Sequence, residues 1–335
     1  MNQKKTINKI TKWYGNHSKH IMNGFKWFSL IIFLFLAIRF IDLNEAKSAL
    51  SEISISVFFL YIGMLFLSKI FYAARWKMIN HSLVENESIP VLSFFTTNLL
   101  AEFVTIALPS SIGGEVTRFL KINRHNQDAV ITTTGIFIDR MIGITTMAID
   151  SAVVLLLMGQ SLTINIGKFF PQEHLIPFTL VTLIVGGLIV CFAIRWYKNS
   201  IYPKKIKTAW GLVKQNRFKL LTASAISIIA HILFSLSHVV LFQRLFPLPV
   251  LSVIGVILTP QLGRSIPISI FGVSGGEGLM IISQMMVGMP QSTAVVITFI
   301  SLIARYFFAL FGFLFEILTD GLRFIKDLPN KKRIV

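Results

Sequence analysis

Two breaks containing proline, serine and glycine interrupt apolar stretches of this chain, and a glutamate follows each. The first reads IALPSSIGGE over residues 106–115, and the second reads SIPISIFGVSGGEG over residues 265–278. Proline ends a helix because it has no N–H, whereas serine can cap the helix that follows and glycine allows close approach of a ligand. Each break therefore predicts a helix N-terminus directed into the protein, where its partial positive charge suits an anion such as phosphate.

The two breaks supply most of the candidate substrate-binding residues. At membrane depth, the backbone can leave helical geometry only where protein or water satisfies its polar groups. Kinked packing hairpins with glycine at helix contacts are the alternative, but two breaks with matching features favour a lined cavity. The candidates are Pro109, Ser111, Gly113, Gly114, Glu115, Pro267, Ser269, Gly275, Gly276 and Glu277.

Charged side chains also lie inside apolar segments, where each costs about 2.5–3.5 kcal/mol at a helix centre unless it is paired or hydrated. Four of them complete the candidate set: Arg118, Asp139, Arg140 and Arg305. Adjacent helical residues point in different directions, so Asp139 and Arg140 should pair with other helices. We expect Arg140, Arg264 and Arg305 to find partners among Glu115, Asp139 and Glu277. Buried ion pairs that only hold helices together are the alternative for each residue.

The composition identifies an integral membrane protein. Of 335 residues, 54% are hydrophobic and 14% are charged, and the mean hydropathy is +0.70. Several apolar runs approach the length of about 20 residues that crosses a bilayer. We expect an all-α integral membrane fold with about six spans, and two re-entrant broken hairpins over residues 91–124 and 250–290. The expected spans are 27–41, 53–71, 129–158, 176–194, 220–242 and 293–318.

The net charge of +17 follows membrane topology and does not indicate nucleic-acid binding. Residues 1–26 carry six lysines and no acid, residues 195–219 carry eight basic residues and no acid, and residues 320–335 carry five basic residues against two acids. Basic segments of this kind mark the cytoplasmic side of a membrane. We therefore expect a multi-pass protein of the cell membrane with both termini in the cytoplasm. On this reading Arg75 and Lys77 mark a cytoplasmic end, and Lys69 snorkels towards the interface.

The spans and breaks occur in the same order twice. We expect a first membrane repeat at residues 27–158 and a second at residues 159–319, which includes the basic cytoplasmic loop 195–219. Basic tails at residues 1–26 and 320–335 flank the repeats. Each repeat has two spans, a broken hairpin and one more span, and an odd number of spans orients the halves oppositely. This order predicts an inverted-topology repeat with a site near the bilayer midplane.

No motif for hydrolytic or group-transfer chemistry is present, so the sequence predicts no catalytic residue, no cofactor and no metal site. The chain lacks a nucleophile elbow, a His-Glu-x-x-His sequence and a phosphate-binding Walker loop. Its single cysteine, Cys191, cannot form an intrachain disulfide. His231 and His238 share a helix face and are interpreted as packing residues, because neither has an evident acidic partner.

At its breaks the chain resembles the flippase-like family related to the transmembrane region of lysylphosphatidylglycerol synthase. A Pro-x-Ser-x-Gly-Gly-acid-x-x-Arg signature is met from Pro109 to Arg118, and an Asp-Arg-x-x-Gly signature from Asp139 to Gly143. A third, Gly-rich signature is met in part at 267–278, where Gly276 stands in place of an arginine. The resemblance implies movement of lipid or lipid-linked headgroups between leaflets. Synthase members carry a further aminoacyl-transferase domain, and we expect this chain to be the translocation module alone.

The sequence thus predicts a non-enzymatic membrane protein that translocates an anionic phospholipid or a lipid-linked saccharide, with a possible role in cell-envelope glycolipid or polysaccharide assembly. Expected partners are that lipid, the membrane, and either a second copy or a glycosyltransferase. Two alternatives remain: an intramembrane enzyme acting on a lipid headgroup, and a non-transporting scaffold for glycosyltransferases. A transporter needs a cavity at the breaks, an enzyme needs two carboxylates converging near one of them, and a scaffold needs neither.

Overall fold

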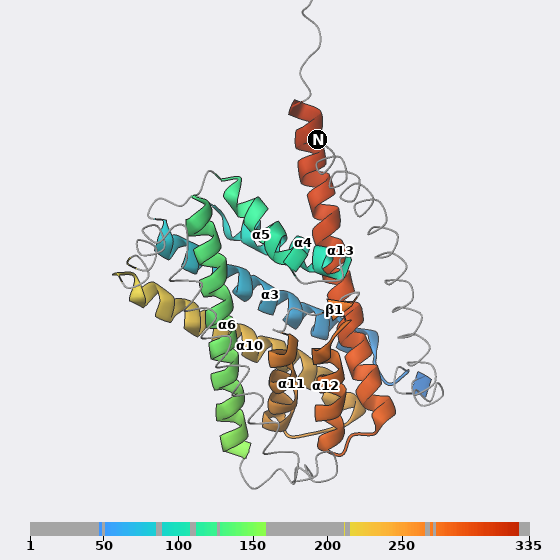
Figure 1. Ribbon diagram of the computed structural model, residues 1–335. Coiled ribbons are helices and arrows are strands. Elements are labelled where there is room, and N and C mark those ends of the chain that lie inside the picture. The colour runs from blue at the N-terminus through green and yellow to red at the C-terminus, as the bar shows by residue number, and fades with distance from the viewer. Residues whose placement is uncertain are drawn as a thin grey trace, which may run out of the picture.

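The computed structural model describes residues 47–48, 51–84, 89–107, 112–125, 128–158, 211, 215–264, 269–270 and 273–327 (Figure 1). This described part contains eight helices. They are α3 (Ile55–Leu83), α4 (Val91–Ala107), α5 (Ile112–Asn123), α6 (Ala129–Met158), α10 (Arg217–Leu245), α11 (Val250–Arg264), α12 (Gly275–Met286) and α13 (Gln291–Asp327). The predicted all-α integral membrane fold is confirmed. A two-residue antiparallel pair, β1 (Ser269–Ile270) with β2 (Val273–Ser274), is an unpredicted detail of the second break.

Four of the six expected spans fall in described helices. Residues 129–158 form α6, residues 220–242 lie in α10, and residues 293–318 lie in α13. The span expected at 53–71 belongs to α3, which continues to Leu83. Three helices, at 55–83, 217–245 and 291–319, are long and apolar enough to cross a membrane. Several expected segments lie outside the described residues. They are the spans at 27–41 and 176–194, the basic loop 195–219 up to residue 210, and the basic tail at 1–26.

Local sequence explains where several helices begin. The Ser54 hydroxyl accepts a hydrogen bond from the backbone N–H of Val57 at 3.4 Å and caps α3. The Asp128 carboxylate accepts one from the N–H of Val130 at 2.8 Å at the start of α6. Within the apolar helices, hydroxyls such as that of Thr146 donate to carbonyls one turn back. Such back-bonding satisfies polar side chains without water.

Both predicted breaks separate two short helices that pack together. α4 packs on α5 around the first break, and α11 packs on α12 around the second. A Cβ added at Gly114 would lie 2.8 Å from the carbonyl oxygen of Ala101, so only glycine allows α5 to approach α4 this closely. The hairpins form where the sequence predicts them. Their re-entrance from one face of the membrane stays a prediction.

The contacts between helices repeat along the chain. α3 packs along α10, and the contacts of α3 with α4 and α5 with α6 recur as those of α10 with α11 and α12 with α13. The hairpins are exchanged: α4 packs on α13, and α11 packs on α6. In Figure 1, α6 runs downwards and α13 upwards, and α3 and α10 also run in opposite directions. Each half therefore packs its hairpin against the last helix of the other.

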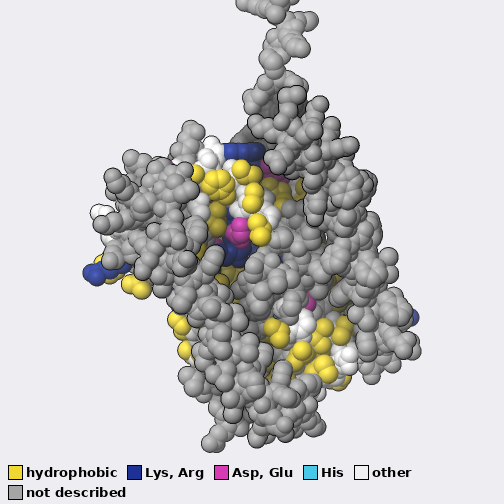
Figure 2. All heavy atoms as spheres, viewed as in Figure 1, with side chains coloured by type: hydrophobic (Ala, Val, Ile, Leu, Met, Phe, Trp, Pro, Cys, Tyr) yellow, Lys and Arg dark blue, Asp and Glu magenta, His cyan; other side chains and the backbone are white. Residues whose placement is uncertain are grey.

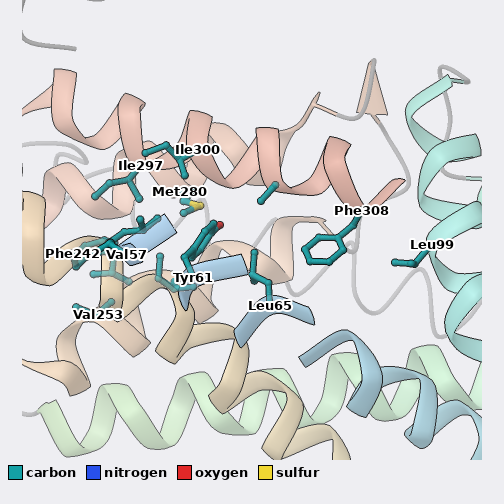
Figure 3. Packing of buried hydrophobic residues seen from close by; sticks show 14 of the residues in the cluster. Val57, Tyr61, Leu65, Leu99, Phe242, Val253, Met280, Ile297, Ile300 and Phe308 are labelled. Atoms are coloured by element: carbon teal, nitrogen blue, oxygen red, sulfur yellow. The ribbon is translucent and has the colours of Figure 1, made fainter. Parts of the chain in front are cut away.

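The main hydrophobic core joins both parts of the chain. Tyr61 of α3, Phe242 of α10, Ile257 of α11 and Ile297 of α13 are fully buried in one cluster, and Figure 3 shows several of its members. Burying large apolar and aromatic side chains in this way is worth about 1.5–3 kcal/mol each relative to water. This cluster holds α3, α10, α13 and the second hairpin together.

The outer surface of the long helices is apolar. On α13, side chains spaced by three or four residues are about half exposed and form one stripe: Phe299, Ile303, Phe307, Leu310 and Leu314. α3 and α10 expose large side chains such as Phe59 and Phe218 in the same way. Such contiguous apolar surface belongs in contact with lipid. Figure 2 shows acidic and basic side chains gathered together between hydrophobic ones on the viewed face.

Candidate functional site

A cavity of about 350 Å³ lies among α3, α4, α5, α6, α10, α11 and α13, and is called here the charged cavity. Among the described residues, its lining contains five cationic side chains and three carboxylates. The cations are Lys69, Arg75, Arg118, Arg140 and Arg305, and the carboxylates are Glu102, Glu115 and Asp139. The excess of cations makes the lining favourable for an anion.

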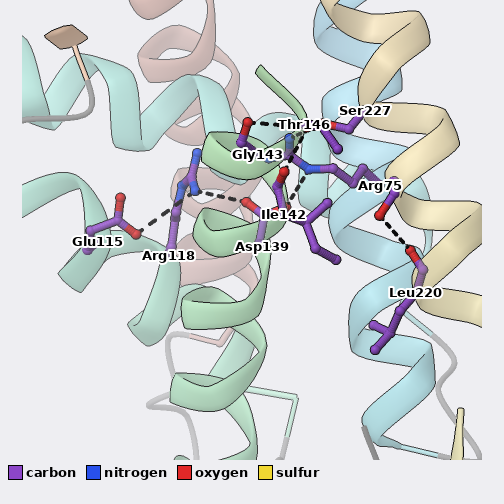
Figure 4. A network of polar contacts seen from close by, with 10 residues as sticks. Arg75, Glu115, Arg118, Asp139, Ile142, Gly143, Thr146, Leu220 and Ser227 are labelled. Carbon is purple, nitrogen blue, oxygen red and sulfur yellow. Dashed lines mark hydrogen bonds and ion pairs between the residues drawn. The ribbon is translucent and has the colours of Figure 1, made fainter. Parts of the chain in front are cut away.

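Asp139 of α6 is the centre of the first ion-pair network (Figure 4). Its Oδ1 accepts a hydrogen bond from Nε of Arg75 at 2.8 Å, and its Oδ2 lies 3.6 Å from Nη1 of Arg118. Arg75 also donates to the Ser227 hydroxyl at 2.9 Å, which in turn bonds Thr146 at 2.8 Å. The network thus joins α3, α5, α6 and α10 through one carboxylate.

Gly143 provides the space that this network needs. It lies one turn after Asp139, and a Cβ added there would be 3.0 Å from Nη1 and 3.4 Å from Cζ of Arg75. The guanidinium of Arg75 therefore lies against the bare backbone at Gly143 while it reaches Asp139. This packing gives a physical reason for the Asp-Arg-x-x-Gly spacing.

Glu115, in the first turn of α5, binds two arginines. Arg140 of α6 donates to its Oε1, which confirms one predicted pairing, and Nη1 of Arg118 lies 3.9 Å from its Oε2. Arg118 also places its guanidinium 5.2 Å from the centre of the Trp76 ring, an attractive cation–π contact. Arg118 thus connects Glu115 with Asp139, and it contacts both carboxylates at distances longer than a tight hydrogen bond.

Glu102 of α4 organises the second network. Its Oε2 accepts from Nζ of Lys69 at 2.6 Å and its Oε1 from Nε of Arg305 at 3.2 Å. Nη1 of Arg305 lies 3.5 Å from Oε1 of Glu277, which confirms the other predicted pairing. Glu277, in the first turn of α12, is buried. Each Gly-Gly-Glu turn therefore has its glutamate bound to an arginine of the long helix that follows it.

The structure brings six of the fourteen candidates into the cavity lining: Gly114, Glu115, Arg118, Asp139, Arg140 and Arg305. Glu277 joins the cavity through Arg305. Gly276 is buried but does not line the cavity, and the carbonyl of Gly113 accepts from the Thr117 hydroxyl. Gly275 opens α12 and Ser269 lies in β1. Pro109, Ser111 and Pro267 lie outside the described residues.

Two interpretations of single residues are wrong, and a third residue has a partner that the sequence does not predict. Lys69 does not snorkel to an interface but binds Glu102 and lines the cavity. The cytoplasmic end that Arg75 is expected to mark stays a prediction, but Arg75 is largely buried, since only 9% of its side chain is exposed where it binds Asp139. His231 is not a simple packing residue, because its Nδ1 lies 2.7 Å from Oδ2 of Asp150. In each case the partner lies on another helix, 33 to 81 residues away along the chain, and the local sequence does not indicate it.

The described residues contain no group of three or more His, Cys, Asp or Glu side chains that could hold a metal ion. The carboxylates of the cavity are instead engaged by arginine and lysine. What the site can do chemically is to hold an anion among guanidinium and ammonium groups, beside the N-terminus of α5.

The apolar exterior, the membrane-length helices and the charged cavity together define a polytopic helical membrane protein with an internal polar site. Residues 26–312 match the family described as the lysylphosphatidylglycerol synthase TM region. The chain belongs to this family, which is related to lipid handling. Comparisons with curated proteins and with solved structures give no significant match.

Proposed function

We propose that this protein binds the anionic headgroup of a phospholipid or a lipid-linked saccharide in the charged cavity and translocates it between the leaflets of the cell membrane. The observation that carries this proposal is the lining of five cations against three carboxylates. Membership in a family related to lipid handling supports a lipid as the source of the anion. Cell-envelope glycolipid or polysaccharide assembly is the process in which such a lipid would be used.

Arg118 and Arg140 are the proposed ligands of the phosphate. Arg140 is the most exposed cation in the networks, with 49% of its side chain accessible. Arg118 contacts its carboxylates at 3.6 and 3.9 Å, so a phosphate can take up its donors without breaking a tight hydrogen bond. A guanidinium can bind phosphate through two parallel N–H groups, which an ammonium cannot do.

The size of the cavity favours a headgroup over a whole lipid. A volume of about 350 Å³ is at the lower end of the range of about 300–1,000 Å³ for small-molecule sites. In this proposal the acyl chains stay outside in the bilayer while the headgroup crosses. The exchanged hairpins are consistent with an inverted repeat whose halves rock about the cavity, with both termini in the cytoplasm.

A non-enzymatic role is part of the proposal. Glu115 and Asp139 converge on Arg118, as the enzyme alternative requires. Both are, however, engaged by a further arginine, Arg140 or Arg75. That arrangement suits holding charge more than exchanging protons with a substrate. A scaffold, the other alternative, has no need of a charged cavity.

Transport by Arg118 variants tests the proposal. Purified protein is reconstituted into liposomes with a short-chain fluorescent phosphatidylglycerol, and albumin extracts the outer-leaflet probe. We expect Arg118→Gln to abolish most of the protein-dependent movement and Arg118→Lys to retain part of it, because charge remains without the planar fork. Arg217→Gln is the matched control, because Arg217 is exposed at the start of α10 and does not line the cavity.

Thermal stability in the same detergent separates a binding role from a structural one. Removing one partner of a buried ion pair costs about 3–5 kcal/mol, so a structural role predicts that lost stability and lost transport go together in Arg118→Gln. A binding role predicts lost transport in protein that remains folded. Normal transport by Arg118→Gln would disprove the phosphate role.

A further inference from the structure

We infer that His231 and Asp150 form a proton-binding site that couples translocation to the movement of a proton across the membrane. This inference rests on the proposed function and adds the energy source. His231, in the middle of α10, is 1% exposed and lines the charged cavity. Its Nδ1 lies 2.7 Å from Oδ2 of Asp150 on α6.

The two ring nitrogens of His231 have different surroundings. Asp150 accepts a hydrogen bond from Nδ1–H, and this contact selects the tautomer in which Nε2 carries a lone pair. Among the described residues, Nε2 is buried and has no hydrogen-bond partner. A proton can therefore add to Nε2, which produces an imidazolium paired with the carboxylate of Asp150. It leaves from the same atom when the neutral tautomer is restored.

The second histidine on this face has a different environment. His238 also lines the cavity, but its Nε2 contacts the Ser301 hydroxyl at 3.0 Å and its Nδ1 lies 2.9 Å from the carbonyl of Phe234. Both of its ring nitrogens are occupied by neutral groups. His231 contacts a carboxylate, whereas these contacts of His238 are with a hydroxyl and a carbonyl, and this contrast supplies a control variant.

The charged and titratable groups around His231 come from the helices packed against α10. From α6 come Asp150, which contacts the ring, and Asp139 and Arg140, which line the same cavity. From α3 come Arg75 and Lys69, together with Tyr72, whose ring centre lies 5.8 Å from that of His231. Arg305 of α13 lines the same cavity, and α11 contributes the neutral Gln261. An imidazolium here adds a positive charge to a lining that already favours anions, so proton binding and phosphate binding strengthen each other.

The repeated helix packing shows why a histidine is notable at this position. His231 is the fifteenth residue of α10, and Lys69 is the fifteenth residue of α3. Glu102 and Gln261 likewise share the twelfth position of α4 and α11. One half thus places a permanent cation in the cavity wall, whereas the other places a cation that depends on a proton.

The His231–Asp150 pair also spans the interface that alternating access would open. α6 is the last helix of the first expected repeat and α10 belongs to the second, so the contact joins the two halves of the chain through residues 81 apart. The Asp150 carboxylate is already charged when the ring is neutral, and protonation adds the opposite charge, so the hydrogen bond becomes an ion pair and is strengthened. The proton therefore stabilises the contact between α6 and α10 described here, and its release on the other side weakens that contact.

Transport under a pH gradient tests the coupling. Liposomes carrying the fluorescent phosphatidylglycerol are given a gradient of about one pH unit in either direction, a step that changes the ratio of protonated to neutral imidazole about tenfold. Valinomycin with equal potassium on both sides holds the membrane potential at zero. We expect the native protein to move lipid several-fold faster with one polarity than with the other.

His231→Gln and Asp150→Asn should each remove this dependence on polarity, with each rate normalised to that of the same variant without a gradient. His238→Gln should keep it. Equal rates for the native protein in both polarities would overturn the inference while leaving the proposed function intact. A polarity effect that survives in His231→Gln would overturn it as well.

A second measurement does not depend on lipid movement. Nitrogen-15 spectra of the purified full-length protein with labelled histidine, assigned by comparison with His231→Gln, report the protonated fraction of the ring. We expect the addition of phosphatidylglycerol at constant pH to increase the protonated fraction of the His231 ring. A ring that stays neutral over the whole pH range in which the protein is folded would exclude the proton site, even if no lipid transport were detected.

Discussion

Asp139 shows how one carboxylate can organise a membrane site. Only 3% of its side chain is exposed, yet it binds Arg75 and Arg118, which come from different helices. A buried carboxylate is stable only when its charge is matched, and removing one partner leaves the other uncompensated. Gly143 lies against Arg75 and so controls the geometry of the pair from one turn away.

Replacing Gly143 should displace Arg75. A Cβ there meets the guanidinium at 3.0 Å, and the additional methyl groups of valine reach further into the same space. We expect Gly143→Val to lower the free energy of unfolding by about 1–3 kcal/mol and Gly143→Ala by less, because the end of an arginine side chain can move. Thermal unfolding in detergent measures this, with Gly63→Val as control, since a Cβ at Gly63 meets nothing within 4 Å. Equal stability of Gly143→Val and Gly63→Val would contradict the packing argument.

The sequence predicts those ion pairs in which both the acidic and the basic residue lie inside apolar segments. Arg140 with Glu115 and Arg305 with Glu277 could be expected because each group alone would be costly in an apolar segment. The pairing of Arg75 with Asp139 could not be expected, because a basic residue that follows an apolar run is also typical of the cytoplasmic end of a membrane span. Asp150 and His231 are far apart along the chain, and periodicity indicates which face a residue occupies but not which helix covers that face.

Two helices, α5 and α13, pack closely against α4 through a glycine. Gly114 of α5 comes against Ala101 on one side. On the other, a Cβ added at Gly312 of α13 would lie 2.5 Å from Cβ and 2.6 Å from the carbonyl carbon of Leu99. Small residues allow helices to pack this closely in a membrane, where van der Waals contact drives association.

Gly312→Ala should separate α13 from α4. Its new methyl group meets backbone atoms, which cannot rotate away, so we expect a loss of about 1–3 kcal/mol or more in stability and a lower yield of folded protein. Gly63→Ala is the matched control, and we expect it to match or slightly exceed the native melting temperature, because alanine favours helix over glycine. Melting temperatures of the two variants in the same detergent decide the point. A Gly312→Ala protein as stable as the native one would show that the helices are less closely packed.

Helix limits follow from sequence more readily than helix partners do. α4 ends at Ala107 and α5 begins at Ile112, while α11 ends at Arg264 and α12 begins at Gly275, and these limits lie next to the prolines and glycines that predict them. The packing of α4 on α13 and of α11 on α6 could not be derived, because apolar faces of similar width are equally suited to several neighbours.

At the scale of the whole molecule, the orientation of the helices in the membrane is still a prediction. The basic segments place residues 86, 126, 205 and 330 in the cytoplasm and residues 46, 170 and 247 outside. The described contacts, with each hairpin seated on the opposite half, fit that scheme without defining the membrane planes.

Cysteine labelling measures the orientation directly. In a background with Cys191→Ser, we expect Asn86→Cys and Asn126→Cys to react with an impermeant maleimide only from the cytoplasmic side, because both flank the first hairpin. Ala46→Cys and Pro247→Cys should react from the outside in intact cells. Labelling of positions 86 and 126 from opposite faces would mean that α4 and α5 cross the membrane and do not re-enter.

The seating of α4 on α13 also has a consequence for how the protein is made. Gly312 follows Leu99 by 213 residues, and ribosomes add about 5–20 residues per second. α4 must therefore wait roughly 10–40 s after its synthesis before its final neighbour exists. During that interval Glu102 cannot bind Arg305, but Lys69 has already been synthesised and can neutralise it. Lys69 is thus the residue that neutralises Glu102 in the membrane until α13 has been synthesised. Its loss should make the nascent protein a substrate for quality-control proteolysis during that interval.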